Sequence, residues 1–112
     1  MDNLEVEKSQ AHIIVEIIDY VPHTVSSKTI IKKLSGNICI MSFDAGEGLT
    51  EKTSPFDTFV QIIDGNAEFV IDGKSNLLKT GQGIIIPAHR SSSVKANKRF
   101  KMILTVIKSG YE

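Results

Sequence analysis

The chain has 112 residues, a length that suits one compact domain and is too short for two. Lysine and arginine together number 13, as do aspartate and glutamate, so the formal net charge is zero. Proteins that bind nucleic acid or membrane surfaces carry a clustered basic excess, and this balance argues against both partners. One group of basic residues is expected to be solvated at a strand rim: Lys95, Lys98, Arg99 and Lys101.

The N-terminal segment, residues 1–24, differs from the rest of the chain. Its first ten residues are polar and acidic, without the apolar core of a signal sequence, and no apolar run approaches a membrane span. Four isoleucines then recur at helical spacing and predict a short amphipathic helix, with Ser9 as its cap and Pro22 as its stop. They are Ile13, Ile14, Ile17 and Ile18.

Residues 25–110 have the period of β-strands and form the predicted domain. Apolar, β-branched runs alternate with turn residues, which is typical of a β-sandwich or barrel of seven or eight short strands. Hairpin turns are predicted at Ser35-Gly36, at Asp64-Gly65-Asn66 and at Asp72-Gly73, because Asp-Gly and Gly-Asn supply the positive φ that tight turns need. Pro87 closes the run Gly83–Ile86, as expected of a residue that cannot donate a backbone hydrogen bond.

The single cysteine, Cys39, excludes an internal disulfide and lies in the apolar run "NICIMSF", where a free cysteine acts as a small buried hydrophobe. No histidine or other base surrounds it, so a catalytic thiol is not indicated. Together with the polar N-terminus, this predicts a protein of the reducing cytoplasm.

Two spaced motifs carry a family resemblance. The first runs through Gly46, Lys52, Ser54, Thr58 and Gly65, and the second consists of Gly81, Pro87 and Ser92. With the phrases "SPFDTFVQIIDGNAEFVIDGK" and "LKTGQGIIIPAH", this frame resembles the two motifs of the cupin family over roughly residues 28–107. The resemblance implies an all-β jelly-roll barrel, to which the predicted N-terminal helix is added.

The resemblance also exposes a difference. Metal-bearing cupins carry two histidines and a glutamate in the first motif and a third histidine in the second. Those four positions fall here on Lys52, Ser54, Thr58 and Ser92. His89 stands where the family has a glycine, and Ala96 where it has an asparagine. Transition metals prefer imidazole and carboxylate ligands, and an ammonium repels a cation, so we expect no metal and no other cofactor here.

A replacement metal shell would need other ligands, and the nearest candidates are His89, Asp57 and Glu51. His89 is expected in an exposed turn. Asp57 and Glu51 each adjoin a motif position, so strand alternation aims their side chains at the opposite face. Asp57 is expected instead to cap the bend after Pro55. His12 and His23 are expected to be ordinary surface residues outside the barrel.

The pattern favours a metal-free module that binds a small molecule or acts as a sensor. The expected pocket combines the four motif positions with apolar walls, for which the candidates are Met41, Phe59, Met102 and Leu104. Lys52 lies in the polar run "LTEKTSP", and an outward orientation is favoured. Turned inward among hydroxyls it would suit a small acidic metabolite, because it is a point charge surrounded by donors.

Other functions remain open. A metal-dependent cupin enzyme of the dioxygenase or isomerase type would need a non-standard ligand set. A metal-free sugar epimerase would need a base near a positioned tyrosine, but Tyr20 and Tyr111 lie near the two ends. No catalytic residue is therefore predicted. A purely structural role is the third possibility, and the resemblance implies a homodimer, in which the partner subunit covers the isoleucine stripe.

Overall fold

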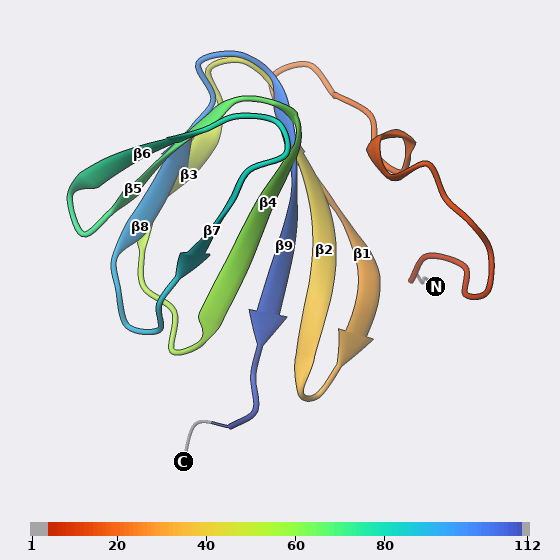
Figure 1. Cartoon of the computed structure of the whole chain (residues 1–112). Coiled ribbons are helices and arrows are strands. Elements are labelled where there is room, and N and C mark those ends of the chain that lie inside the picture. Colours follow the sequence, from red (N-terminus) through yellow and green to blue (C-terminus); the bar gives the residue numbers. More distant parts are fainter. Residues whose placement is uncertain (1–4, 111–112) are drawn as a thin grey trace.

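The computed structural model describes residues 5–110, which form two antiparallel β-sheets facing each other (Figure 1). The larger sheet has five strands in the order β1 (Val25–Lys33), β2 (Gly36–Phe43), β9 (Phe100–Ile107), β4 (Asp57–Gly65) and β7 (Gly83–Ile86). The smaller sheet has four strands in the order β3 (Gly48–Lys52), β8 (Ser92–Lys95), β5 (Ala67–Ile71) and β6 (Lys74–Leu78). The predicted jelly-roll barrel is confirmed.

Two of the predicted turns are hairpins. The β1–β2 hairpin pairs Lys33 with Gly36, and the β5–β6 hairpin pairs Ile71 with Lys74 across Asp72-Gly73. The remaining connections cross between the sheets, as the strand orders require. This alternation wraps the chain around a single core, and it brings segments that are distant in sequence to the same wall.

The predicted hairpin at Asp64-Gly65-Asn66 is wrong. Gly65 does have the positive φ that was expected, 77°. However, β4 pairs with β9 and β7, whereas β5 pairs with β6 and β8, so the turn carries the chain from one sheet to the other. Local turn chemistry fixes the backbone reversal, but it does not specify which strand becomes the neighbour.

The core lies between the two sheets and includes a stacked pair of aromatic rings at the end where β9 begins. Phe43 and Phe100 stack there with ring centroids 4.4 Å apart and an angle of 7° between the rings. They lie directly opposite each other on β2 and β9. The buried cluster is completed by Val60, Ile62, Ala67, Phe69, Leu78, Val94, Ala96 and Met102.

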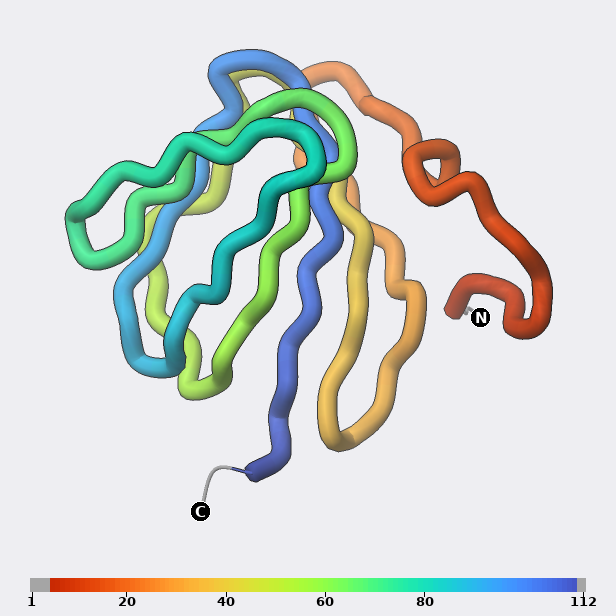
Figure 2. The backbone as a smooth tube through the Cα atoms, in the orientation of Figure 1, coloured from red at the N-terminus to blue at the C-terminus, as the bar shows by residue number. Residues whose placement is uncertain are grey.

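The N-terminal segment runs outside the barrel beside β1 and β2 (Figure 2). The predicted helix is wrong: the segment forms only one 3-10 turn, η1 (Ile14–Glu16). Ser9 has a φ of 59°, which is not the extended conformation of an N-cap residue. Four β-branched isoleucines weaken a helix, and the segment's carbonyl groups bond instead to side chains of the sheet.

Two side chains of the sheet attach this segment. The ammonium of Lys101 donates to the carbonyl of Val15, and the Ser42 hydroxyl donates to the carbonyl of Asp19 at 2.9 Å. Lys101 is only 8% exposed, so its expected position on a solvated rim is wrong. Its neighbours Lys95, Lys98 and Arg99 are exposed, as expected.

Tyr20 also holds the N-terminal segment against the large sheet. Its hydroxyl donates to Asp64 at 2.7 Å, and the Lys101 ammonium lies 4.9 Å from the centre of its ring. Burial, together with the neighbouring Asp64 carboxylate, raises the pKa of the Tyr20 hydroxyl. Ile18 of this segment is buried within its own chain, whereas Ile13 and Ile14 remain 64% and 40% exposed. The stripe is therefore only partly covered by its own barrel.

Candidate functional site

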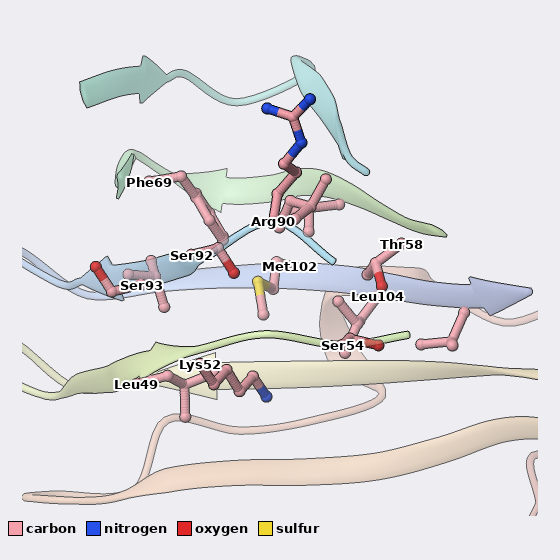
Figure 3. Close-up of a pocket in the computed structure, with 14 residues that line it drawn as sticks. Leu49, Lys52, Ser54, Thr58, Phe69, Arg90, Ser92, Ser93, Met102 and Leu104 are labelled. Carbon is pink, nitrogen blue, oxygen red and sulfur yellow. The ribbon is translucent and has the colours of Figure 1, made fainter. Parts of the chain in front are cut away.

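A cavity of about 130 Å³ opens between the sheets at the end of the barrel opposite the Phe43–Phe100 stack. Its apolar walls come from the inner faces of both sheets: Leu49, Val60, Phe69, Ile86, Val94, Met102, Leu104 and Val106. Its polar side chains are Lys52, Ser54, Thr58, Arg90, Ser92 and Ser93 (Figure 3). The cavity is thus an apolar chamber with a ring of hydroxyl and cationic groups.

The four motif positions all line this cavity. Lys52 on β3 lies directly opposite Ser92 on β8, so the two side chains share the inner face of the small sheet. Thr58 lies on β4 in the wall across from them, between Val106 and Ile86 of the neighbouring strands. Ser54 lies in the connection from β3 to β4. Their role as ligand-binding residues stays a prediction.

A β-bulge in β3 decides where Lys52 points. Leu49 pairs with Val94 and Lys52 with Ser92, so three steps along β3 match two steps along β8. Regular alternation would place residues 49 and 52 on opposite faces, and the extra residue returns both to the inner face. Lys52 therefore lines the cavity while remaining exposed to solvent, which places it at the mouth.

Hydrogen bonds fix the loop that carries Ser54. Its hydroxyl accepts from the backbone N–H of Phe56 at 3.2 Å, and its carbonyl accepts from the N–H of His89 at 2.7 Å. This ties the β3–β4 connection to the β7–β8 connection. The Ser54 oxygen is thus held at the cavity wall with one lone pair already used.

Two of the predicted wall residues lie elsewhere. Met102 and Leu104 line the cavity, whereas Met41 packs against the core outside its lining. Phe59 is 40% exposed on the outer face of the large sheet, opposite Ile85. Because Thr58 faces inward, strand alternation turns Phe59 outward.

The candidates for a replacement metal shell do not line the cavity. His89 is exposed in the turn after β7, with a φ of 67°. Asp57 accepts from the N–H of Ala88 at 2.8 Å and so helps to hold the β7–β8 loop. Its expected role as a cap of the bend after Pro55 stays a prediction. Glu51 accepts a hydrogen bond from the Ser91 hydroxyl. His12 is half-buried and donates from Nε2 to the carbonyl of Glu7 at 2.9 Å, while His23 is exposed.

The donor set does not fit the metal that the fold family carries. An ammonium and three hydroxyls occupy the ligand positions, and none is a ligand that transition metals prefer. Within residues 5–110, no group of three or more histidine, cysteine, aspartate or glutamate side chains is arranged to hold a metal ion. Tyr20 lies on the outside of the large sheet, and Tyr111 lies outside the described residues.

Several residues that line the cavity were not predicted from the sequence. Arg90, Leu49, Phe69 and Ser93 were not among the candidates, although Phe69 lies opposite Val94, two residues along from Ser92. Alternation from Ser92 predicts Val94 on the inner face, and this signal was available. The strand β3 itself was missed, because "GLTEK" carries few β-branched or aromatic residues.

Comparisons with solved structures identify the fold. A conserved protein of unknown function from Streptococcus pyogenes is 26% identical and has a TM-score of 0.89, with 98% of this chain and 97% of that chain covered. A cupin superfamily protein from Desulfitobacterium hafniense is 22% identical over 96% of this chain and 100% of that chain, with a TM-score of 0.88.

A cupin 2 conserved barrel domain protein from Leptotrichia buccalis is 32% identical over 84% of this chain, with a TM-score of 0.81. The match covers 46% of that longer protein. No protein-family profile matches the sequence, and no curated protein matches it. The chain therefore has the cupin fold, and the four motif positions of the sequence resemblance are Lys52, Ser54, Thr58 and Ser92.

No helix among residues 5–110 has the length and hydrophobicity that crossing a membrane requires.

Proposed function

We propose that this protein is a metal-free binding module for a small organic acid. The observation that carries the proposal is the composition of one cavity: an ammonium and three hydroxyls at the motif positions, above a chamber of aliphatic and aromatic side chains. Ligand sites in β-barrels lie at such mouths and combine apolar walls with a few placed polar groups.

Lys52 gives the site its charge preference. It lines the cavity and forms no ion pair with any residue from 5 to 110. A carboxylate at the mouth can accept a charge-assisted hydrogen bond from Lys52 and further hydrogen bonds from Ser92 and Thr58. A cation would be repelled, and a neutral ligand would leave the ammonium without a partner.

The size of the cavity limits the rest of the ligand. A dry engineered cavity of about 150 Å³ in another protein accommodates benzene. The present chamber, at about 130 Å³, is of the same order and suits a compact apolar body rather than a long chain. Phe69, Met102 and Leu104 provide the surface that such a body would contact.

Binding of benzoate tests this proposal, because its ring matches the chamber and its carboxylate matches the mouth. Calorimetric or NMR titration is expected to show benzoate bound more tightly than the neutral isostere benzamide. Lys52→Ala is expected to lower benzoate affinity about tenfold, the loss of one charge-assisted hydrogen bond. Lys28→Ala removes an exposed lysine of β1 and serves as the matched control. Equal affinity of benzoate in all three proteins would refute the proposal.

A metal-dependent dioxygenase or isomerase is not supported by a specific observation. It would need ligands from outside the cavity lining, because Glu51, Asp57 and His89 are placed in its surrounding loops and edges. The absence of a cofactor and a cytoplasmic location both stay predictions from the sequence.

We also propose that the protein is a homodimer that associates through the outer face of the large sheet and the N-terminal segment. Ile13, Ile85 and Ile107 are each more than half exposed, and Ile85 lies beside Phe59 on the outer face of the large sheet. Burying one such side chain contributes about 1.5–3 kcal/mol. Sedimentation velocity is expected to show a dimer that Ile14→Asp and Ile85→Asp weaken. Leu34→Asp, at the tip of the β1–β2 hairpin, is the control. A monomer at micromolar concentration would refute this.

A further inference from the structure

The mouth of the cavity contains a second cation that is already paired. Arg90 lines the cavity, yet its guanidinium lies on the side away from Lys52 (Figure 3). It donates to Asp72 with 2.7 Å between Nη1 and Oδ2. The hydrogen bond from Arg90 is the main reason that the pKa of the Asp72 carboxyl lies below its usual value.

Asp72 is held in place from the backbone as well. Its N–H donates to the carbonyl of Ser91 at 2.8 Å, and its Oδ1 accepts from the N–H of Ser91 at 3.2 Å. These bonds join the tip of the β5–β6 hairpin to the loop before β8. The Asp72 carboxylate does not itself line the cavity, but these bonds hold it in place beside Arg90.

The charges around the mouth then fall into two kinds. Arg90 is neutralised by Asp72 at contact distance, and Glu51 adds a further carboxylate that accepts from Ser91. Lys52 is left without an ion pair to any described residue. A ligand with one negative charge meets the unpaired Lys52. A ligand with two negative charges must draw Arg90 away from Asp72. The Asp72 carboxylate then lies beside the second charge of the ligand, and the two repel each other.

We infer that Asp72 and Arg90 set the charge class of the ligand, so that the site takes monocarboxylates and rejects dicarboxylates. This rests on the proposed function, and it adds a specificity-determining pair outside the motif positions. Arg90 is a second potential anion-binding group. Its aliphatic stem forms part of the cavity wall, while its guanidinium is paired with Asp72. Exclusion of the dianion comes from a repulsive element, as specificity often requires.

The variant Asp72→Asn separates the two roles of Asp72. Asparagine keeps an oxygen to accept from the N–H of Ser91, and it tolerates the φ of 50° at this position. It removes the charge that holds Arg90. Thermal unfolding is used first to establish that the variant is folded.

The probes are benzoate and phthalate at pH 7.5, which share a ring and differ by one adjacent carboxylate. In the wild type, benzoate is expected to bind at least about tenfold more tightly than phthalate. In Asp72→Asn, phthalate affinity is expected to rise about tenfold, because Arg90 can form a bidentate pair with the second carboxylate. Benzoate affinity is expected to change less than about threefold. The double variant Asp72→Asn with Arg90→Gln is expected to lose the gain for phthalate.

The outcomes separate this inference from the proposed function. If benzoate binding depends on Lys52 but phthalate gains nothing in Asp72→Asn, the inference is overturned and the binding module stands. If the gain persists in the double variant, Arg90 is not its source and the inference is likewise overturned. If neither probe binds the wild type or Asp72→Asn, both proposals are overturned.

Discussion

The two ends of the barrel are built from the same strands and have opposite character. Near the start of β9, Phe100 is buried and stacked on Phe43, and no cavity-lining hydroxyl is present there among the described residues. Further along β9, Leu104 and Val106 are only half-buried and line the cavity with Thr58 of β4. The end around Phe43 and Phe100, which we call the closed end, is a packed core. The end that Thr58, Leu104 and Val106 line, which we call the open end, is a chamber.

This difference shows that one pair of strands can supply stability at one end and a binding surface at the other. The closed end is also sealed from outside, where Tyr20, Asp64 and Lys101 attach the N-terminal segment. The open end is framed by polar loops that hydrogen-bond one another, with His89 donating to Ser54 and Ala88 to Asp57. Changes at the two ends should therefore affect different properties of the protein.

The largest effect is expected from Phe100→Ala at the closed end. Removing a ring with no exposed surface, stacked 4.4 Å from Phe43, leaves a cavity in the buried core. The free energy of unfolding is expected to fall by about 3–5 kcal/mol. Thr58→Val at the open end is the matched comparison and is expected to change it by less than about 1 kcal/mol. Urea unfolding measures both, and equal losses would contradict the division into two ends.

A second prediction concerns metal binding by histidines introduced at the open end. Lys52→His, Ser54→His and Ser92→His together restore three imidazoles at positions that line one cavity. Zinc or nickel is then expected to stabilise the variant by about 2.7 kcal/mol when the metal is present at a hundred times its dissociation constant. Thermal unfolding with and without metal measures this.

The double variant Ser54→His with Ser92→His is the control for the triple variant and is expected to respond less. Stabilisation by metal in the wild type equal to that of the triple variant would show that hydroxyls and an ammonium suffice, against the preference of transition metals for imidazole and carboxylate ligands.

The smallest effect is expected at Asp44, outside the closed end. Hydrogen bonds from the His23 backbone and from Arg99 lower the pKa of its carboxyl from 3.8 to about 2. Because the folded-state pKa is depressed, the stabilisation is present above about pH 4 and is lost as the pH falls toward 2. Asp44→Asn is expected to flatten the fall in unfolding free energy across that interval. Denaturant unfolding at several pH values measures the slope, and parallel curves for the two proteins would exclude this role.

Much of the barrel could be predicted because its causes are local. Alternating β-branched runs predicted the strands, and Asp72-Gly73 predicted the β5–β6 hairpin. The same reasoning failed at Asp64-Gly65-Asn66, which changes sheets, and in the isoleucine stripe, which forms one 3-10 turn. In both places the neighbouring element was decided by contacts that are distant in sequence.

The candidate site was predictable where the motif frame applied and not beyond it. Lys52, Ser54, Thr58 and Ser92 were identified through the resemblance of the two motifs to those of cupins, and all four line the cavity. Phe59 was a candidate for the apolar wall but lies on the outer face, as strand alternation from Thr58 indicates. Arg90 carried no local signal, because its importance depends on the salt bridge to Asp72, which lies at the tip of the β5–β6 hairpin.

The sequence by itself determined an all-β barrel and the chemical character of the motif positions, because strand period, turn residues and side-chain type are local properties. Only the tertiary structure decided that the bulge in β3 turns Lys52 toward the cavity, that Lys101 is buried beneath the N-terminal segment, and that Asp72 pairs with Arg90. Each of these depends on how strands from different parts of the chain are paired. Register and sheet neighbours are set by the burial of the whole core, which no short stretch of sequence specifies.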